Sequence, residues 1–196
     1  LARHSIDSIK GRPMQTTPEE QTVLVIGAAG IDIVARLDGE TQMGTSNPSR
    51  IRTSFGGTAR NVAENLARLG QPVSLLAVLG NDHPGEEILA YTRQAGVDVT
   101  HIHKVEKYPT GAYMAVLSEQ GRLEYAFDDM RVLEELTASY LTYHQDLFEA
   151  ASLLFIDANL PPNTLQTAFE LAERYQLPVC ADPTSRPLAP RLKPYL

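Results

Sequence analysis

The stretch SFGGTARNVAENLARLG, residues 54–70, decides how the rest of this 196-residue chain is interpreted. It places two adjacent glycines, Gly56 and Gly57, between a short extended segment and a helix with apolar residues at helical spacing. Glycine permits positive φ angles and the close approach of a ligand. The first turn of a helix also exposes unpaired backbone N–H groups at its positive end. The junction therefore predicts either a binding site for hydroxyls or an anion, or tight packing of the strand against the helix.

Asn61 lies one turn into this helix and favours the binding interpretation. Asparagine is a mediocre residue inside helices, and its amide offers both a donor and an acceptor to a polyol. Asp32 adds a second signal, because it follows the apolar run 23–26, at the end of a strand where ligands bind in open α/β sheets. A carboxylate accepts hydrogen bonds from paired hydroxyls, although an exposed turn or a helix cap would also explain Asp32.

Apolar strands alternate with amphipathic helices along the chain, which predicts an α/β fold with a mostly parallel sheet. Strands are expected at 23–26, 73–80, 152–161 and 177–185, and helices at 58–69, 83–96, 137–151 and 162–176. The last helix is expected to begin with Asn163 or Thr164 as its cap, and Cys180 is expected to be a small buried strand residue. The segments 111–118 and 122–127 alternate and predict a hairpin, part of a region at 101–128 that stands off the main sheet.

Composition excludes several classes of function. The net charge is −7 and no face is predicted to carry a basic stripe, so a nucleic acid is not an expected partner. No apolar run approaches the ~20 residues that span a bilayer, so a membrane is not expected either. The single cysteine suits a reducing, cytoplasmic location. The polar segment 1–21, with its glycine and prolines, is predicted to be a linker or mobile arm, followed by one domain at 22–196.

The quoted stretch resembles the N-terminal signature of the PfkB, or ribokinase-like, carbohydrate kinases. The resemblance includes the Gly-Gly turn, the Asn four residues after the second Gly, and the G-x-D-x-x-G pattern of Gly80, Asp82 and Gly85. It covers roughly residues 23–190. It implies a doubly wound, mostly parallel sheet with a small β lid, formed here by about 34–55 and 101–128.

Within this family, the segments SNPSRI, RNVAENLARLG, FDDM, DANLP and DPTS are together similar to the pseudouridine kinase branch. Asp128 departs from that pattern, because Asn is common there. Thr58 and Ala59 likewise stand where Val-Gly is common. The resemblance implies transfer of a phosphoryl group from ATP to the 5′-hydroxyl of pseudouridine.

The resemblance also assigns roles to individual residues. Substrate contacts are expected at Asp32, Ser46, Asn47, Gly56, Gly57, Asn61, Thr110, Tyr113, Asp129 and Asn159. Ser46 and Asn47 would face the base or the ribose, and Thr110 and Tyr113 would belong to the lid. Asp182 and Arg186 would lie near the phosphate and Mg²⁺. Packing remains an alternative for Tyr113, a strand-end turn for Asn159, and a solvated tail for Arg186.

The catalytic base of the family is the Asp of a Gly-Ala-Gly-Asp motif that opens a helix, and this sequence contains no such motif. The GAAGID segment at 27–32 is only superficially similar, because it belongs to the first strand. We therefore expect the chain to be the substrate-binding part of a kinase truncated before its nucleotide half, inactive alone. ATP and Mg²⁺ would be bound mainly by the missing part. The lid would pair two subunits into a homodimer.

Three alternatives remain open. In the first, the acceptor is another sugar, such as ribose, fructose or ketodeoxygluconate. In the second, the chain is a non-catalytic module that binds a sugar or nucleoside. A dinucleotide-binding domain is the third alternative, but it requires G-x-G-x-x-G directly after the first strand, and GAAGID has the wrong spacing.

Overall fold

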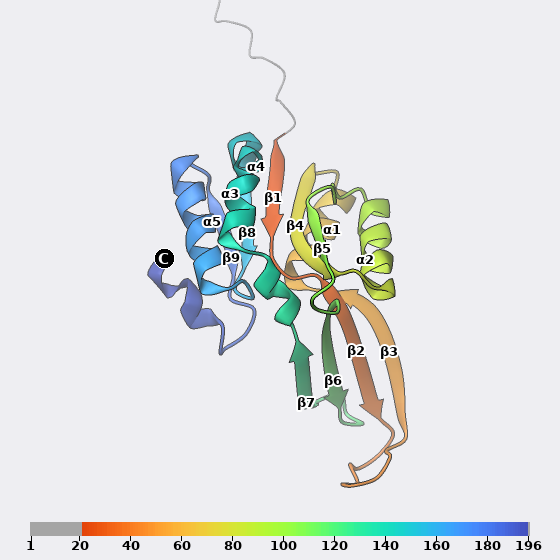
Figure 1. Ribbon diagram of the computed structural model, residues 1–196. Coiled ribbons are helices and arrows are strands. Elements are labelled where there is room, and N and C mark those ends of the chain that lie inside the picture. Colours follow the sequence, from red (N-terminus) through yellow and green to blue (C-terminus); the bar gives the residue numbers. More distant parts are fainter. Residues whose placement is uncertain (1–20, 196) are drawn as a thin grey trace, which may run out of the picture.

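The computed structural model describes residues 21–195, so most of the expected arm at 1–21 lies outside the described residues. A main sheet of five parallel strands runs in the order β5-β4-β1-β8-β9, and a second sheet runs in the order β3-β2-β6-β7. Figure 1 shows the second sheet projecting from the end of the main sheet at which β1 leads into β2. The strands are β1 Thr22–Ile26, β2 Gly30–Leu37, β3 Ser49–Gly56, β4 Val73–Gly80, β5 Ile102–Val105, β6 Gly111–Leu117, β7 Leu123–Asp129, β8 Ala151–Asp157 and β9 Val179–Asp182.

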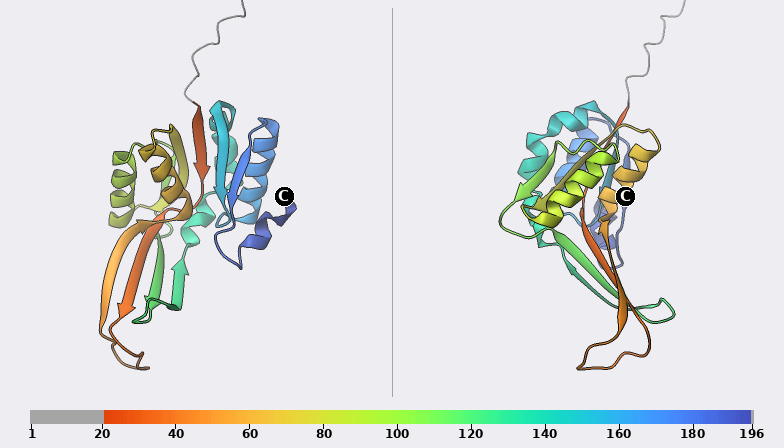
Figure 2. Two further views of the ribbon diagram at one scale, coloured as in Figure 1. Left: turned by 180° about the vertical axis from the view of Figure 1, so that it is seen from behind. Right: turned by 90° about the vertical axis from the view of Figure 1, so that its right-hand side faces the viewer.

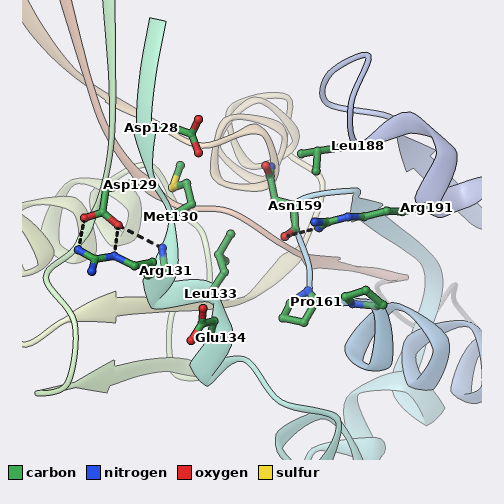
Figure 3. A pocket seen from close by; sticks show the side chains of 11 residues that line it. Asp128, Asp129, Met130, Arg131, Leu133, Glu134, Asn159, Pro161, Leu188 and Arg191 are labelled. Atoms are coloured by element: carbon green, nitrogen blue, oxygen red, sulfur yellow. Dashed lines mark hydrogen bonds and ion pairs between the residues drawn. The ribbon is translucent and has the colours of Figure 1, made fainter.

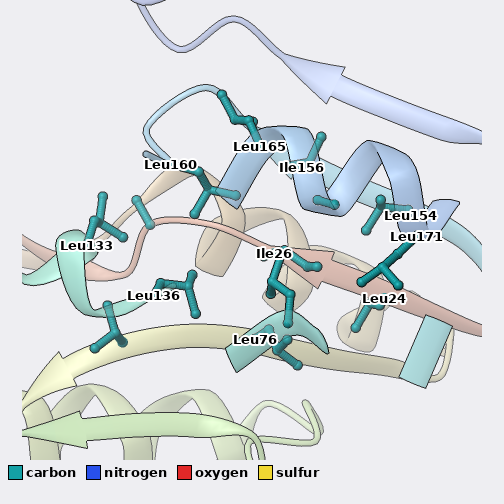
Figure 4. Close-up of a cluster of buried hydrophobic side chains, with 14 of the residues drawn as sticks. Leu24, Ile26, Leu76, Leu133, Leu136, Leu154, Ile156, Leu160, Leu165 and Leu171 are labelled. Atoms are coloured by element: carbon teal, nitrogen blue, oxygen red, sulfur yellow. The ribbon is translucent and has the colours of Figure 1, made fainter. Parts of the chain in front are cut away.

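Helices cover both faces of the main sheet, which makes the predicted α/β fold a three-layer structure (Figure 2). They are α1 Thr58–Arg68, α2 His83–Gln94, α3 Ala138–Tyr143, α4 Gln145–Ala150 and α5 Pro162–Arg174, with short 3₁₀ segments η1 Arg131–Glu135 and η2 Ala189–Tyr195. Alternate residues of the central strand β1 face opposite layers. Because helices cover both faces of the sheet, residues 23–26 are all apolar. Leu24 and Ile26 pack toward α5 and η1, as Figure 4 shows, whereas Val23 and Val25 pack toward α1 and α2.

The second sheet corresponds to the lid expected at about 34–55 and 101–128, but it begins earlier than expected. Strand β1 ends at Ile26 and β2 begins at Gly30, so Asp32 belongs to the lid sheet and not to the first strand. The register of the lid divides its residues between two faces. Asp32 pairs with Ser54 on one side and with Tyr113 on the other, and Tyr113 pairs with Asp128. These residues share one face because side chains alternate along a strand. The neighbouring residue of each strand therefore points to the opposite face.

A hydroxyl-centred junction ties the lid to the main sheet. Thr110 precedes β6, and its buried hydroxyl accepts a hydrogen bond from the backbone N–H of Gly80 (3.0 Å) and donates to Asp82 (2.5 Å). Asp82 also accepts from the backbone N–H of Thr110 (2.8 Å) and caps α2 through the N–H of Gly85. Burial opposes ionisation of Asp82, but these hydrogen bonds lower its pKa. The G-x-D-x-x-G pattern is thus explained by a joint between β4, α2 and the lid.

Four other local predictions differ from the structure. The segment expected to stand off the sheet from residue 101 includes β5, which pairs with β4 in the main sheet. The expected helix 137–151 divides into α3 and α4 at His144. Helix α5 begins after Pro161 without a side-chain cap, because the Thr164 hydroxyl donates to the carbonyl of Leu136 (2.7 Å). Cys180 is exposed rather than buried, because β9 is the last strand of its sheet in the described part of the chain.

Candidate substrate site

The Gly-Gly turn connects the lid to α1. Gly57 is the N-cap residue of α1 and has a φ of 92°, which favours glycine over residues with a side chain. A side chain at Gly56 would clash with the carboxylate of Asp32, which lies on the paired strand β2. Both explanations offered for the two glycines therefore apply: the turn is tightly packed, and it brings the start of α1 beside Asp32.

A cavity of about 340 Å³ lies at this junction, and we call it the Asp32 cavity. Among the predicted site residues it is lined by Asp32, Gly57, Asn61, Tyr113 and Asn159. Its remaining walls are Ala28, Thr58, Asp128, Met130, Thr184, Ser185 and Leu188. Among the described residues, the lining contains carboxylates, amides and hydroxyls, but no lysine or arginine. This chemistry suits a neutral ligand that carries several hydroxyl groups.

Asp32 is half-buried in the wall of this cavity. Burial raises the pKa of its carboxyl, and the positive charge of Arg60 opposes that shift. Arg60 lies in the first turn of α1 and donates to the carbonyl of Gly56 (3.0 Å). Asp32 thus has a nearby cation that favours its ionised form, the form that accepts hydrogen bonds from hydroxyl groups.

Asp157 is a fully buried carboxylate at the end of β8 that the sequence-based site omits. It accepts hydrogen bonds from the backbone N–H groups of Ala28 (2.9 Å), Ala59 (3.1 Å) and Asn159 (3.0 Å). Burial raises its pKa, and these hydrogen bonds oppose the increase. Asp157 therefore fixes three segments of the cavity wall without lining the cavity. The sequence signal that could have identified Asp157 was an acidic residue at the end of an apolar strand.

Asp129 lies on a neighbouring cavity of about 620 Å³, shown in Figure 3. Its carboxylate pairs with Arg131 (2.6 and 2.8 Å), and these hydrogen bonds lower the pKa of Asp129. Asp128, one residue earlier, instead shares the lid face of Asp32 and lines both cavities. Because side chains alternate between the two faces of a strand, the adjacent aspartates of FDDM had to point to opposite faces, and this was the available signal in the sequence. Arg191 donates to the carbonyls of residues 158–160 at the edge of the same neighbouring cavity.

Five predicted contacts do not line the Asp32 cavity: Gly56 and Asp129, described above, and Ser46, Asn47 and Thr110. Ser46 and Asn47 are in the loop between β2 and β3, at the far end of the lid, because the two strands carry that loop away from the sheet junction (Figure 1). The Asn47 side chain closes its own loop through Gln42 (2.7 and 3.0 Å). Thr110 is occupied by the joint with Asp82 and lines neither cavity.

The segment after β9 contributes differently from the prediction. Asp182 accepts from the backbone N–H of Thr184 (2.6 Å), which turns the chain toward the Asp32 cavity. Thr184 and Ser185 line that cavity, whereas Asp182 and Arg186 do not. Arg186 is exposed. The expected role of Asp182 and Arg186 near a phosphate and Mg²⁺ stays a prediction.

Over residues 21–195, no three His, Cys, Asp or Glu side chains are grouped so that they would hold a metal ion. Over the same range, none of the helices combines the length and apolarity needed to cross a bilayer.

The sequence matches the pfkB family of carbohydrate kinases over residues 20–195. The uncharacterized sugar kinase YeiI of Escherichia coli is 36% identical over 100% of this chain and 55% of its own length. The pseudouridine kinase of Escherichia coli is 34% identical over 85% of this chain and 53% of its own length. A carbohydrate kinase from Agrobacterium tumefaciens has the same fold, with a TM-score of 0.78 and 34% identity over 88% of this chain and 57% of that one.

The chain thus spans about half the length of the curated relatives that it matches. The family match covers all the described residues and includes the Gly-Gly turn, the lid and the Asp32 cavity. The ribokinase-like fold predicted from the sequence is confirmed by the structural neighbour. On these findings, the chain belongs to the pfkB family of carbohydrate kinases.

Proposed function

We propose that this chain forms the substrate-binding part of an enzyme that transfers a phosphoryl group from ATP to a hydroxyl of a sugar or nucleoside, with pseudouridine as the acceptor. The observation that carries this proposal is the Asp32 cavity, where Asp32, Asn61 and the first turn of α1 surround a space lined by neutral and acidic polar groups. The similarity to the Escherichia coli pseudouridine kinase supports the choice of acceptor. The product is pseudouridine 5′-phosphate.

The residues of this chain would bind and orient the acceptor. Asp32 and Asp128 accept hydrogen bonds from hydroxyls, Asn61 and Asn159 offer amides, and the lid strand that carries Tyr113 covers one side. Phosphoryl transfer depends mainly on such positioning and on charge stabilisation at the phosphate. The sequence contains no Gly-Ala-Gly-Asp motif for the catalytic base. We therefore expect the 196-residue chain to bind the acceptor without consuming ATP.

A titration of the chain with pseudouridine, uridine, ribose and fructose tests this proposal, with ATP consumption followed in the same samples. We expect pseudouridine to bind most tightly, and Asp32→Asn to weaken its binding about 10- to 100-fold, because hydrogen bonds to charged groups are among the strongest. Asp38→Asn is the matched control, since Asp38 forms an exposed ion pair with Arg50 on the lid and does not line the Asp32 cavity. Absence of binding to all four compounds would overturn the proposal.

A sugar acceptor other than pseudouridine is the second candidate. Ser46 and Asn47, the residues expected to face the base or the ribose, lie away from the Asp32 cavity. The relative YeiI is named a sugar kinase. Tighter binding of ribose or fructose than of pseudouridine would select this candidate. Binding of pseudouridine by a complete protein that never consumes ATP would select the non-catalytic module instead.

We also propose that the lid pairs two copies of the chain. The face of the lid opposite Asp32 exposes a group of large apolar side chains: Ile51, Met114, Tyr125 and Phe127. Strand register pairs Met114 with Ile33 and Phe127, and the next row on the same face carries Ile51 and Tyr125. Exposed apolar patches of this kind mark interaction surfaces. A second copy would cover this face and leave the Asp32 face open to substrate.

A further inference from the structure

Arg60 is a buried arginine directly behind the Gly-Gly turn. Only 2% of the residue is exposed, although it lies in the first turn of α1. The positive end of the helix dipole disfavours a cation at that position, and burial of a charge is costly unless the charge is paired. Arg60 contradicts the first preference and meets the second only through its hydrogen bonds and ion pair, which indicates a specific role for those contacts.

The guanidinium of Arg60 is held from three sides. Its Nε donates to the carbonyl of Gly56 (3.0 Å), and an Nη donates to the carbonyl of Phe55 (3.2 Å). Its other Nη pairs with the carboxylate of Glu64 (2.6 Å). The centre of the Tyr91 ring lies 5.9 Å from the guanidinium carbon. These contacts fix both the end of β3 and the orientation of the guanidinium.

The same guanidinium donates to the side-chain oxygen of Asn61. Because a guanidinium carries donors and no acceptor, only the amide oxygen of Asn61 can pair with it. The amide nitrogen is therefore directed away from Arg60. Asn61 lines the Asp32 cavity, so this nitrogen is available as a donor to a ligand there.

We propose that Arg60 is a positioning residue that sets the side-chain amide of Asn61 so that its N–H groups, and not its oxygen, serve the Asp32 cavity. The proposal rests on the proposed function and narrows the ligand class. Asp32 accepts and Asn61 donates, so a ligand group that meets both must donate and accept at once. A hydroxyl does so, whereas an ammonium group has no acceptor. The pair thus selects hydroxyl groups over amines.

The first part of the test needs no ligand. In the ¹⁵N-labelled chain we expect the Asn61 side-chain amide to be ordered, with a high heteronuclear NOE, and to become disordered in Arg60→Met. Asn61→Gln identifies its signals. Arg68→Met is the matched control, because Arg68 pairs with the same Glu64 (2.7 Å) but is exposed and has no contact with Asn61. An Asn61 amide that is equally ordered in Arg60→Met would overturn the proposal.

The second part is a double-mutant cycle on pseudouridine binding. We expect Arg60→Met and Asn61→Ala each to weaken binding about tenfold, the effect of one lost hydrogen bond. Arg60→Met also removes the positive charge that opposes protonation of Asp32, so the cycle is measured at about pH 8, where a carboxyl group keeps its charge most fully. Under that condition, if Arg60 acts through Asn61, the double variant loses no more affinity than Asn61→Ala alone. Independent, multiplicative losses would overturn the positioning role. Arg68→Met should bind as the unmodified chain does.

Asn61→Asp keeps the test decisive if Arg60→Met fails to fold. Asp at position 61 retains an oxygen for Arg60 but offers no N–H to the cavity, so we expect a folded protein whose binding of pseudouridine is at least tenfold weaker. Unchanged affinity in Asn61→Asp would overturn the proposal. If the unmodified chain binds neither pseudouridine nor ribose while the amide order depends on Arg60, the proposed function fails and the Arg60 pairing is supported.

Discussion

The carboxylate of Asp157 accepts a hydrogen bond from the backbone N–H of Ala59, 98 residues earlier in the chain. The N-cap of α1 is Gly57, which has no side chain to accept from the first turn. A carboxylate from β8 therefore takes the place of a local cap. The same carboxylate holds Ala28 in the loop after β1 (2.9 Å). One buried acceptor thus joins two central strands to the helix that carries Asn61.

Asp157→Asn should lower the free energy of unfolding by about 2–3 kcal/mol, because an amide leaves some of these backbone donors without a charged acceptor. Chemical denaturation measures this difference. Asp38→Asn removes an exposed ion pair instead and should cost less than about 1 kcal/mol. If the two variants are equally stable, the cap role of Asp157 is wrong.

Thr110→Val should lower the free energy of unfolding by about 1–3 kcal/mol, because the N–H of Gly80 and the carboxylate of Asp82 lose their hydroxyl partner in a buried joint. Hydrogen exchange should also increase where the lid meets the main sheet. Thr142→Val is the control, since its hydroxyl bonds an exposed helix carbonyl at Ala138. Equal stability of the two variants would contradict the joint.

Ligand affinity should fall at low pH through protonation of Asp32. Because burial raises the pKa of this carboxyl, with Arg60 opposing the shift, the decline should begin above the ordinary aspartate value of about 4. Calorimetric titration of pseudouridine between about pH 4 and pH 8 measures this dependence. Asp32→Asn should bind weakly and with little dependence on pH. A profile in the unmodified chain that is flat over this range argues against an ionised Asp32 in binding.

His144 should make the fold less stable as the pH falls. Burial lowers its pKa, the neighbouring His101 and His103 add to this effect, and Asp146 opposes it. The unfolded chain then binds the proton more readily than the folded one, so stability is full above about pH 6.5 and decreases below it. Denaturation curves measured at several pH values give the free energy of unfolding at each pH. This free energy should depend less steeply on pH in His144→Gln than in the unmodified chain. An unchanged slope would mean that other groups control this window.

Phe127→Glu should weaken self-association at least tenfold, because it places a charge in the apolar face of the lid, where Phe127 is 60% exposed. Sedimentation equilibrium measures the association constant. Leu69→Glu is the control, since Leu69 is also exposed but lies after α1, away from the lid. If the unmodified chain is monomeric at high concentration, the homodimer through this face is wrong.

Much of the architecture was predictable because the signals are local. The strand 23–26 is apolar at every position, and such a run indicates a strand buried on both faces. Val23 and Leu24 do pack into opposite layers. The hairpin β6–β7 follows from its alternation. Predictions that depended on neighbours were less successful: Thr164 serves the carbonyl of Leu136 rather than its own helix.

The sequence by itself determined the family and the Gly-Gly turn, because glycine conformation, strand ends and helix starts are local properties that a short motif records. It also predicted five of the residues that line the cavity: Asp32, Gly57, Asn61, Tyr113 and Asn159. Only the tertiary structure decided which polar groups share the cavity. Strand register places Asp128, and not Asp129, on the face of Asp32. The length of the lid strands removes Ser46 and Asn47 from that cavity, and Asp157 reaches α1 across the sheet. Each of these relationships depends on contacts between segments distant in the chain.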